Sequence, residues 1–97
     1  MKRAVIAGYS RSPFTMARKG ELIDVKPVNM FAEVVKNLVS KTKVNPADIE
    51  DIVVGCAFQV GEQSFNIGKL TTFLSGMEIH TSGMTVDRWC GSSMEAI

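Results

Sequence analysis

Two near-continuous apolar runs stand out in the chain, one at residues 2–8 and one at residues 52–58. Runs without polar alternation are typical of strands that are buried on both faces of a parallel sheet. They predict strands over Lys2–Gly8 and Ile52–Phe58. A third strand is predicted over Met84–Arg88, directly before a Trp-Cys-Gly turn.

Between these runs, apolar residues recur at spacings of three and four, which predicts amphipathic helices. The first helix begins at or just after Pro27, because proline is favoured at the first helical position. Its apolar stripe consists of Val28, Phe31, Val34, Val35, Leu38 and Val39. A second helix is predicted over Phe65–Leu74, and a third begins near Ser92. Asn45–Asp48 predicts a single capped turn.

The resulting order is β-α-β-α-β-α, which predicts an α/β fold with right-handed crossovers and a mostly parallel sheet covered by helices. Residues Tyr9–Val25 form a long polar connection, and connections of this length usually have a functional or specialised structural role. The chain has 97 residues and stops at Ile97, roughly two turns into the third predicted helix. No Gly, Asn or Pro ends that helix. We therefore expect residues 1–97 to be one incomplete domain, the N-terminal piece of a longer protein.

The charges almost cancel, with 11 basic and 10 acidic residues and a formal net charge of +1. This balance gives no support to nucleic acid or a charged membrane surface as a partner. No apolar run is long enough to span a bilayer, and the short N-terminal run does not fit a secretory signal. Two cysteines without close spacing suit a reducing compartment, so we expect a cytoplasmic protein.

The main candidate for chemistry is Cys90, at the turn between the third predicted strand and the helix that begins near Ser92. At such a turn, the first N–H groups of the helix and its dipole stabilise a thiolate. The same N–H groups can bind an oxyanion that develops beside the sulfur. The alternative is that Cys90 is a small buried hydrophobe, as free cysteines usually are. Cys56, inside an apolar strand, is interpreted as structural.

The other candidate residues give weaker patterns. His80 is the only histidine and a candidate base for Cys90, but the predicted strand separates the two, which favours a surface loop position. Arg11, Arg18 and Lys19 carry charges suited to a phosphate, yet no glycine-rich cradle accompanies them, so a solvated loop is the favoured interpretation. The chain has no Cys-x-x-Cys, no histidine cluster and no dinucleotide-binding glycine pattern, so we expect no metal and no nucleotide cofactor.

Several segments together resemble the thiolase family, from one end of the chain to the other. The segment Val86–Ala96 is similar to the family's active-site signature, Val-Asn-x-x-Cys-x-Ser-Gly/Ser-x-x-Ala. Arg11–Pro13 resembles its Arg-Thr-Pro motif, and Asp51–Gly61 resembles its second strand. Glu62–Lys69 resembles a segment of the degradative 3-ketoacyl-CoA thiolases that form the β-subunit of bacterial fatty-acid oxidation complexes.

Two positions depart from the family pattern. Asp87 stands where the family usually has Asn, a residue that we expect to tie down the elbow around Cys90. A carboxylate there brings a negative charge that disfavours a neighbouring thiolate. Thr15 replaces a glycine that is common after the Arg-Thr-Pro motif, which indicates a slightly different loop.

The resemblance implies a partial thiolase-like N-terminal half and a thiolytic cleavage with coenzyme A as substrate. Cys90 attacks the keto carbon of a 3-ketoacyl-CoA, with its own backbone N–H in the oxyanion site. Acetyl-CoA leaves, and the shortened acyl group stays on Cys90 until a second CoA thiol takes it. Family members supply the activating histidine, a second histidine and an acid/base cysteine from later in the chain, so residues 1–97 alone are expected to be inactive.

The resemblance also implies partners: a homo-oligomer for the full-length protein and the α-subunit of a fatty-acid oxidation complex. Two other functions remain open at this point. A ketoacyl synthase or related condensing enzyme shares the fold and the cysteine. A non-catalytic, thiolase-like interaction module is the alternative from another class, and Asp87 is the feature that favours it.

Overall fold

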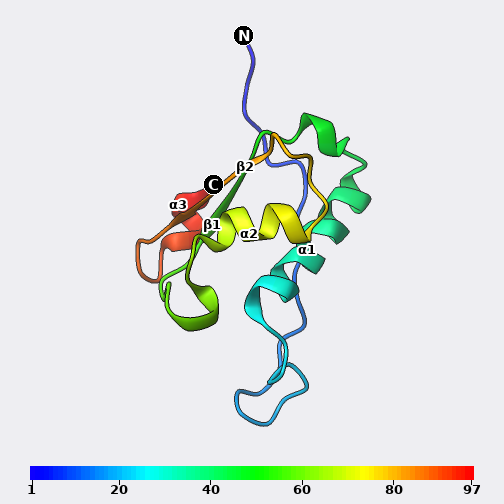
Figure 1. Ribbon diagram of the computed structural model, residues 1–97. Helices are drawn as coiled ribbons and strands as arrows, with labels where there is room; N and C mark the ends of the chain where they lie inside the picture. The colour runs from blue at the N-terminus through cyan, green and yellow to red at the C-terminus, as the bar shows by residue number, and fades with distance from the viewer.

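The computed structural model describes residues 1–97 as an α/β fold in which three helices accompany a small parallel sheet (Figure 1). The helices and strands, in chain order, are α1 Pro27–Thr42, β1 Asp51–Gly55, α2 Ile67–Leu74, β2 Ser82–Val86 and α3 Ser92–Ala96. Two short 3-10 turns, Pro46–Asp48 and Gly61–Gln63, lie on either side of β1.

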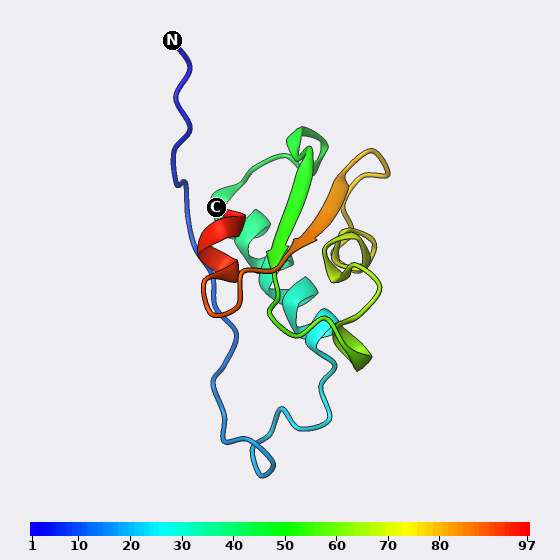
Figure 2. The same cartoon turned by 90° about the vertical axis from the view of Figure 1, so that its left-hand side faces the viewer.

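The sheet has two strands, β1 and β2, which pair in parallel from Asp51 opposite Ser82 to Gly55 opposite Val86. The N–H of Cys56 donates to the Val86 carbonyl at 3.0 Å and continues the pairing past the end of β1. The connection between the strands runs through α2, which packs against both strands and against α1. Figure 2 shows β1 and β2 side by side, with α3 next to β1. Both strands therefore end beside the segment that carries the candidate cysteine.

The predicted first strand over Lys2–Gly8 is wrong. Residues 1–16 form no regular element, and Figures 1 and 2 show the N-terminus extending away from the body of the molecule. The side chains of Val5 and Ile6 are 79% and 82% exposed. A buried strand pairs with a neighbouring strand and has apolar cover on both faces, whereas this segment pairs with neither β1 nor β2 and stays exposed. The sheet consequently has two strands and not three.

The connection that follows is anchored where it passes α1. Ser10 Oγ donates to Asn37 Oδ1 at 2.7 Å, and Lys41 Nζ donates to the Tyr9 carbonyl at 3.3 Å. The Lys41 ammonium also lies 4.7 Å from the centre of the Tyr9 ring, within the range of a cation–π contact. The chain is thus held to the last turns of α1 before it enters the long loop.

Two of the three predicted helix starts are confirmed, those of α1 and of α3, which begins at Ser92, and the start of α2 is corrected. α1 begins at Pro27, as predicted, and the capped turn is confirmed because Asn45 Oδ1 accepts the Ala47 N–H at 3.1 Å. α2 begins at Ile67 and not at Phe65, because Phe65 and Asn66 both have left-handed backbone angles, with φ of 60° and 54°. Residues in this conformation cannot continue a right-handed helix.

The predicted strand ends are also corrected. β1 ends at Gly55, before the predicted Phe58, and β2 covers Ser82–Val86 instead of Met84–Arg88. The apolar composition continues beyond each strand, but the ladder between them ends at Gly55 opposite Val86. Pairing, and not composition, therefore sets the ends of the strands.

A polar network around Asn66 fixes α2 against β2. Thr85 Oγ1 donates to Asn66 Oδ1 at 2.8 Å and accepts the Gly68 N–H at 3.1 Å, and Asn66 Nδ2 donates to the Gly83 carbonyl at 3.0 Å. Gly68 and Gly83 face each other so closely that a Cβ on either would lie within 3.0 Å of the other segment's backbone. Two glycines thus let the helix lie directly on the strand that leads to the candidate site.

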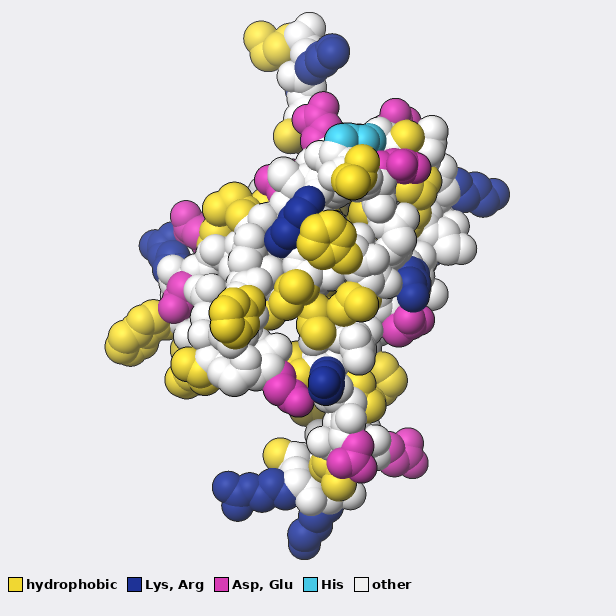
Figure 3. All heavy atoms as spheres, in the orientation of Figure 1, with side chains coloured by type: hydrophobic (Ala, Val, Ile, Leu, Met, Phe, Trp, Pro, Cys, Tyr) yellow, Lys and Arg dark blue, Asp and Glu magenta, His cyan; other side chains and the backbone are white.

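The apolar core is small. Its buried members are Val54, Cys56 and Ile67, with Phe31 and Ile52 packed against them. Many large apolar side chains lie outside this core, and Figure 3 shows apolar side chains gathered over α2 on one face. The structural interpretation of Cys56 agrees with its position, since this residue is only 7% exposed.

Candidate active site

The candidate site is a tight elbow between β2 and α3. β2 ends at Val86, and α3 begins at Ser92. Within the turn, the Gly91 N–H donates to the Arg88 carbonyl at 2.9 Å and the Ser92 N–H donates to the Trp89 carbonyl at 3.1 Å. Trp89 has a φ of 48°, a left-handed conformation that is unfavourable for a bulky residue. Something in the surrounding structure must hold it there.

Asp87 provides the first of these restraints. Its Oδ1 accepts the backbone N–H of Trp89 at 2.9 Å, two residues further along the chain. This is the arrangement in which Asp and Asn side chains imitate a backbone turn. A carboxylate oxygen and an amide oxygen lie at the same position on Asp and Asn side chains, and both accept a hydrogen bond. Asp87 can therefore restrain the elbow as an asparagine would.

Ser92 provides the second restraint, from the helix side. Its side chain is buried, with the residue only 4% exposed. Ser92 Oγ accepts the Arg88 N–H at 2.8 Å and donates to the Trp89 carbonyl at 2.7 Å. One hydroxyl therefore ties both sides of the turn together. The exposed ion pair between Arg88 and Glu95 adds little, because such pairs contribute at most about 1 kcal/mol.

Gly55 sets the distance between the elbow and the sheet. A Cβ on Gly55 would lie 2.4 Å from the carbonyl carbon of Ser92 and from the nitrogen of Ser93. The end of β1 and the start of α3 are therefore in direct backbone contact, which only a glycine permits. From the sequence alone, neither Gly55 nor Ser92 is a candidate site residue. A glycine at the end of an apolar strand is the available signal for such a close approach.

Cys90 lies at the tip of this elbow as an exposed free thiol. The hydrogen bonds of the turn use the N–H groups of Gly91 and Ser92, and none of them uses the N–H of Cys90. A nucleophilic sulfur with an unengaged N–H on the same residue is the arrangement needed to attack a carbonyl carbon and to bind the resulting oxyanion. The alternative interpretation, that Cys90 is a small buried hydrophobe, does not fit this exposed position.

The thiol opens into an apolar cavity of about 380 Å³. Four residues line it: Ala57, Phe58, Trp89 and Cys90. They come from the segments that follow β1 and β2, so the cavity lies at the carboxyl ends of the two parallel strands. Ligands of open parallel sheets commonly bind at these ends.

His80 does not lie with Cys90. It precedes β2 while Cys90 follows it, and a five-residue strand spans roughly 16 Å. The His80 ring Nε2 lies 3.1 Å from the Ala47 carbonyl, in the exposed loop at the other end of the strand. The prediction of a surface loop histidine is confirmed, and within residues 1–97 no histidine is available to activate the thiol.

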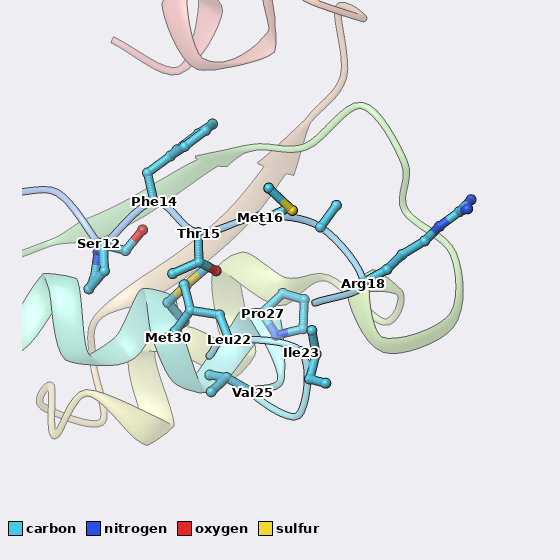
Figure 4. Close-up of a pocket in the computed structure, with 12 residues that line it drawn as sticks. Ser12, Phe14, Thr15, Met16, Arg18, Leu22, Ile23, Val25, Pro27 and Met30 are labelled. Carbon is cyan, nitrogen blue, oxygen red and sulfur yellow. The ribbon is translucent and has the colours of Figure 1, made fainter. Parts of the chain in front are cut away.

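The basic residues of the long connection also lie apart from the elbow. Arg11, Arg18 and Lys19 are exposed, and none of them forms an ion pair. A cavity of about 410 Å³ lies between this loop and the start of α1, and Figure 4 shows the Arg18 side chain extending away from it. The solvated-loop interpretation is therefore confirmed for these residues. No group of three or more His, Cys, Asp or Glu side chains is placed to hold a metal ion.

Comparison with known proteins agrees with the signature around Cys90. The family model of the thiolase N-terminal domain matches residues 4–97, nearly the whole chain. The chain belongs to the thiolase family. Among its relatives, the 3-ketoacyl-CoA thiolases of Colwellia psychrerythraea and Shewanella frigidimarina are each 39% identical over 98 residues, and that of Vibrio vulnificus is 36% identical. The predicted family resemblance is thus confirmed.

A solved structure shows the same fold. The crystal structure of the Bacillus anthracis acetyl-CoA acetyltransferase superposes with a TM-score of 0.82 and 27% identity, over 94% of this chain and 23% of that one. The alignments with the three relatives cover 100% of this chain and 25% of each relative, so the chain spans a quarter of their length. Within residues 1–97, no helix has both the length and the apolar character needed to cross a membrane.

Proposed function

We propose that the complete protein containing residues 1–97 is a degradative thiolase. It cleaves a 3-ketoacyl-CoA with CoA to acetyl-CoA and an acyl-CoA that is shorter by two carbons. The observation that carries this proposal is the exposed Cys90 thiol, held at a restrained elbow within the thiolase signature. The printed names of the relatives, 3-ketoacyl-CoA thiolase, support the substrate class.

In the proposed reaction the Cys90 thiolate attacks the keto carbon and forms a C–S bond. The carbonyl oxygen becomes an oxyanion, and in this proposal the N–H of Cys90, which no hydrogen bond of the turn uses, stabilises it. Collapse of this intermediate breaks the Cα–Cβ bond, and the electron pair goes to Cα, where a proton completes acetyl-CoA. The thiol of a second CoA then attacks the acyl group, and Cys90 leaves as a thiolate.

The base that activates Cys90 and the acid that protonates Cα must come from outside residues 1–97, since His80 lies at the wrong end of β2. We therefore propose that residues 1–97 alone are an incomplete domain without thiolase activity. Coenzyme A is a substrate in this proposal, and no metal or further cofactor takes part.

The proposal extends to location and partners. It places the complete protein in the cytoplasm, in fatty-acid degradation, as a homo-oligomer. The resemblance of Glu62–Lys69 to the β-subunits of fatty-acid oxidation complexes supports an α-subunit of such a complex as a further partner. Co-purification of the complete protein with that subunit is the direct check on this part of the proposal.

The activity is tested with the complete protein, acetoacetyl-CoA or a longer 3-ketoacyl-CoA, and CoA, by following the loss of the keto thioester. Cys90→Ala is expected to abolish thiolysis, while Cys56→Ala, which changes the buried cysteine, is the matched control and retains it. A Cys90→Ala protein that kept its thiolysis rate would contradict the proposed mechanism.

A second candidate reaction comes from the structural neighbour, which is named an acetyl-CoA acetyltransferase. That name describes acetyl transfer between two acetyl-CoA molecules, a two-carbon reaction that needs no room for a long chain. Relative kcat/KM for acetoacetyl-CoA and for longer 3-ketoacyl-CoA substrates separates the two candidates. Activity with acetoacetyl-CoA alone would favour the acetyl transfer.

A further inference from the structure

The cavity beside Cys90 contains no polar side chain. Its lining consists of the thiol itself, Ala57, and the rings of Phe58 and Trp89. A cavity that binds a small molecule normally combines an apolar wall with a few polar groups that orient the ligand. Here the only groups of the second kind are the thiol and the unengaged N–H of Cys90. Within residues 1–97, a ligand in this cavity is therefore oriented at Cys90 and makes apolar contacts with the other three residues.

Hydrogen bonds restrain the backbone that carries both rings, and the rings themselves are exposed. Trp89 is 82% exposed, although Asp87 and Ser92 fix its backbone. Phe58 is 74% exposed, and Gln63 Nε2 donates to its carbonyl at 2.8 Å, which restrains the segment after β1. Two exposed aromatic side chains on restrained backbone line one cavity with Cys90, so they form a joint apolar surface and not two scattered side chains.

The apolar character of this surface favours contact with one part of the proposed substrate. Coenzyme A carries two amides along its pantetheine arm and phosphates at its far end, which need hydrogen-bonding or basic side chains, and no such side chain of residues 1–97 lines the cavity. The acyl group is a hydrocarbon chain that starts at the carbon bonded to Cys90 Sγ. The chain is therefore the part of the substrate that fits against the two rings.

Resting on the proposed thiolase function, we propose that Phe58 and Trp89 form the wall along which the acyl chain on Cys90 lies. Contact with this wall makes them specificity-determining residues for chain length. Longer chains gain from the contact, whereas the two-carbon group left from acetoacetyl-CoA is too short to reach beyond the sulfur. Each methylene that the wall removes from water changes kcat/KM by about fourfold, equivalent to about 0.8 kcal/mol.

The test uses the complete protein and compares kcat/KM for 3-ketodecanoyl-CoA with kcat/KM for acetoacetyl-CoA. Phe58→Ala and Trp89→Ala are each expected to lower the ratio of these two values by at least about tenfold. Phe58→Leu, which keeps an apolar side chain, should restore most of the ratio. Phe73→Ala on α2 is the matched control, because it removes an exposed aromatic ring that does not line the cavity.

An unchanged ratio in Phe58→Ala and Trp89→Ala would overturn the inference, whether or not total activity falls. Unchanged activity would mean that another part of the protein or a second copy covers the rings. An equal loss with both substrates would mean that the rings support the elbow and not the chain. These outcomes are distinct from failure of the proposed function, which would appear as thiolysis that survives Cys90→Ala.

Discussion

Replacing Asp87 tests how the elbow is held. In Asp87→Ala, the Trp89 N–H loses its acceptor, while Trp89 still has to adopt a left-handed conformation. That conformation costs about 1–2 kcal/mol for a residue with a side chain. The cost stays in the variant, but the hydrogen bond that offsets it is gone. The elbow is then expected to spend part of its time in conformations that misplace the Cys90 thiol.

The size of the effect follows from the hydrogen bond. A bond to a charged group contributes about 1.5–3 kcal/mol, but Asp87 is exposed to solvent, which lowers the figure to about 1 kcal/mol. This corresponds to a loss of about fivefold in kcat/KM. In Asp87→Asn the amide oxygen accepts the same bond, so the variant is expected to stay within about twofold of the parent protein.

The assay is thiolysis of acetoacetyl-CoA by the complete protein, with Asp51→Ala as the control for removal of an exposed aspartate elsewhere on the sheet. Full activity in Asp87→Ala would show that the hydrogen bond does not hold the elbow. A loss in Asp87→Asn as large as that in Asp87→Ala would show that the charge matters and the bond does not. Either result would refute the reasoning.

Three further predictions concern the same region. Gly55→Ala places a Cβ against the backbone of Ser92 and should lower the free energy of unfolding by about 1–3 kcal/mol in a denaturant titration; an unchanged midpoint would contradict the close approach. Ser92→Ala leaves the Arg88 N–H without its acceptor and should cost about 1–3 kcal/mol by the same measurement, whereas equal stability would show that water replaces the hydroxyl. Iodoacetamide at neutral pH should label the exposed Cys90 well before the buried Cys56, as peptide mass mapping can establish, and the reverse order would remove the basis of the elbow account.

The sequence predicts those elements whose local signals agree with their final contacts. Pro27 and the apolar stripe after it define the start of α1, because proline and helical periodicity act within the helix itself. The Asn45 cap is predicted for the same reason. In contrast, Lys2–Gly8 has the composition of a buried strand but pairs with neither strand of the sheet, and composition does not show which segments pair. Phe65 and Asn66 delay α2 through backbone angles that apolar spacing does not reveal.

Some features of the candidate site can likewise be predicted from the sequence, and others cannot. The motif around Cys90 predicts the elbow, since a strand, a turn and a helix follow one another within a short segment. The family resemblance predicts an Asn at position 87 that ties down the elbow and leaves the effect of a carboxylate there open, and the structure shows Asp87 Oδ1 accepting the Trp89 N–H. The contact of Gly55 with the helix start and the aromatic wall at Phe58 depend on β1, which is distant in sequence. Such long-range contacts are determined by strand pairing, which the motif does not contain.

The central claim is that Cys90 carries the acyl group, and a trapped intermediate tests it most directly. The complete protein is mixed with a 3-ketoacyl-CoA in the absence of free CoA, quenched in acid, digested and examined by mass spectrometry. We expect the mass of the shortened acyl group on the peptide that contains Cys90, and its loss when CoA is added before the quench. Acylation of another residue, or thiolysis without any acyl group on Cys90, would contradict the account.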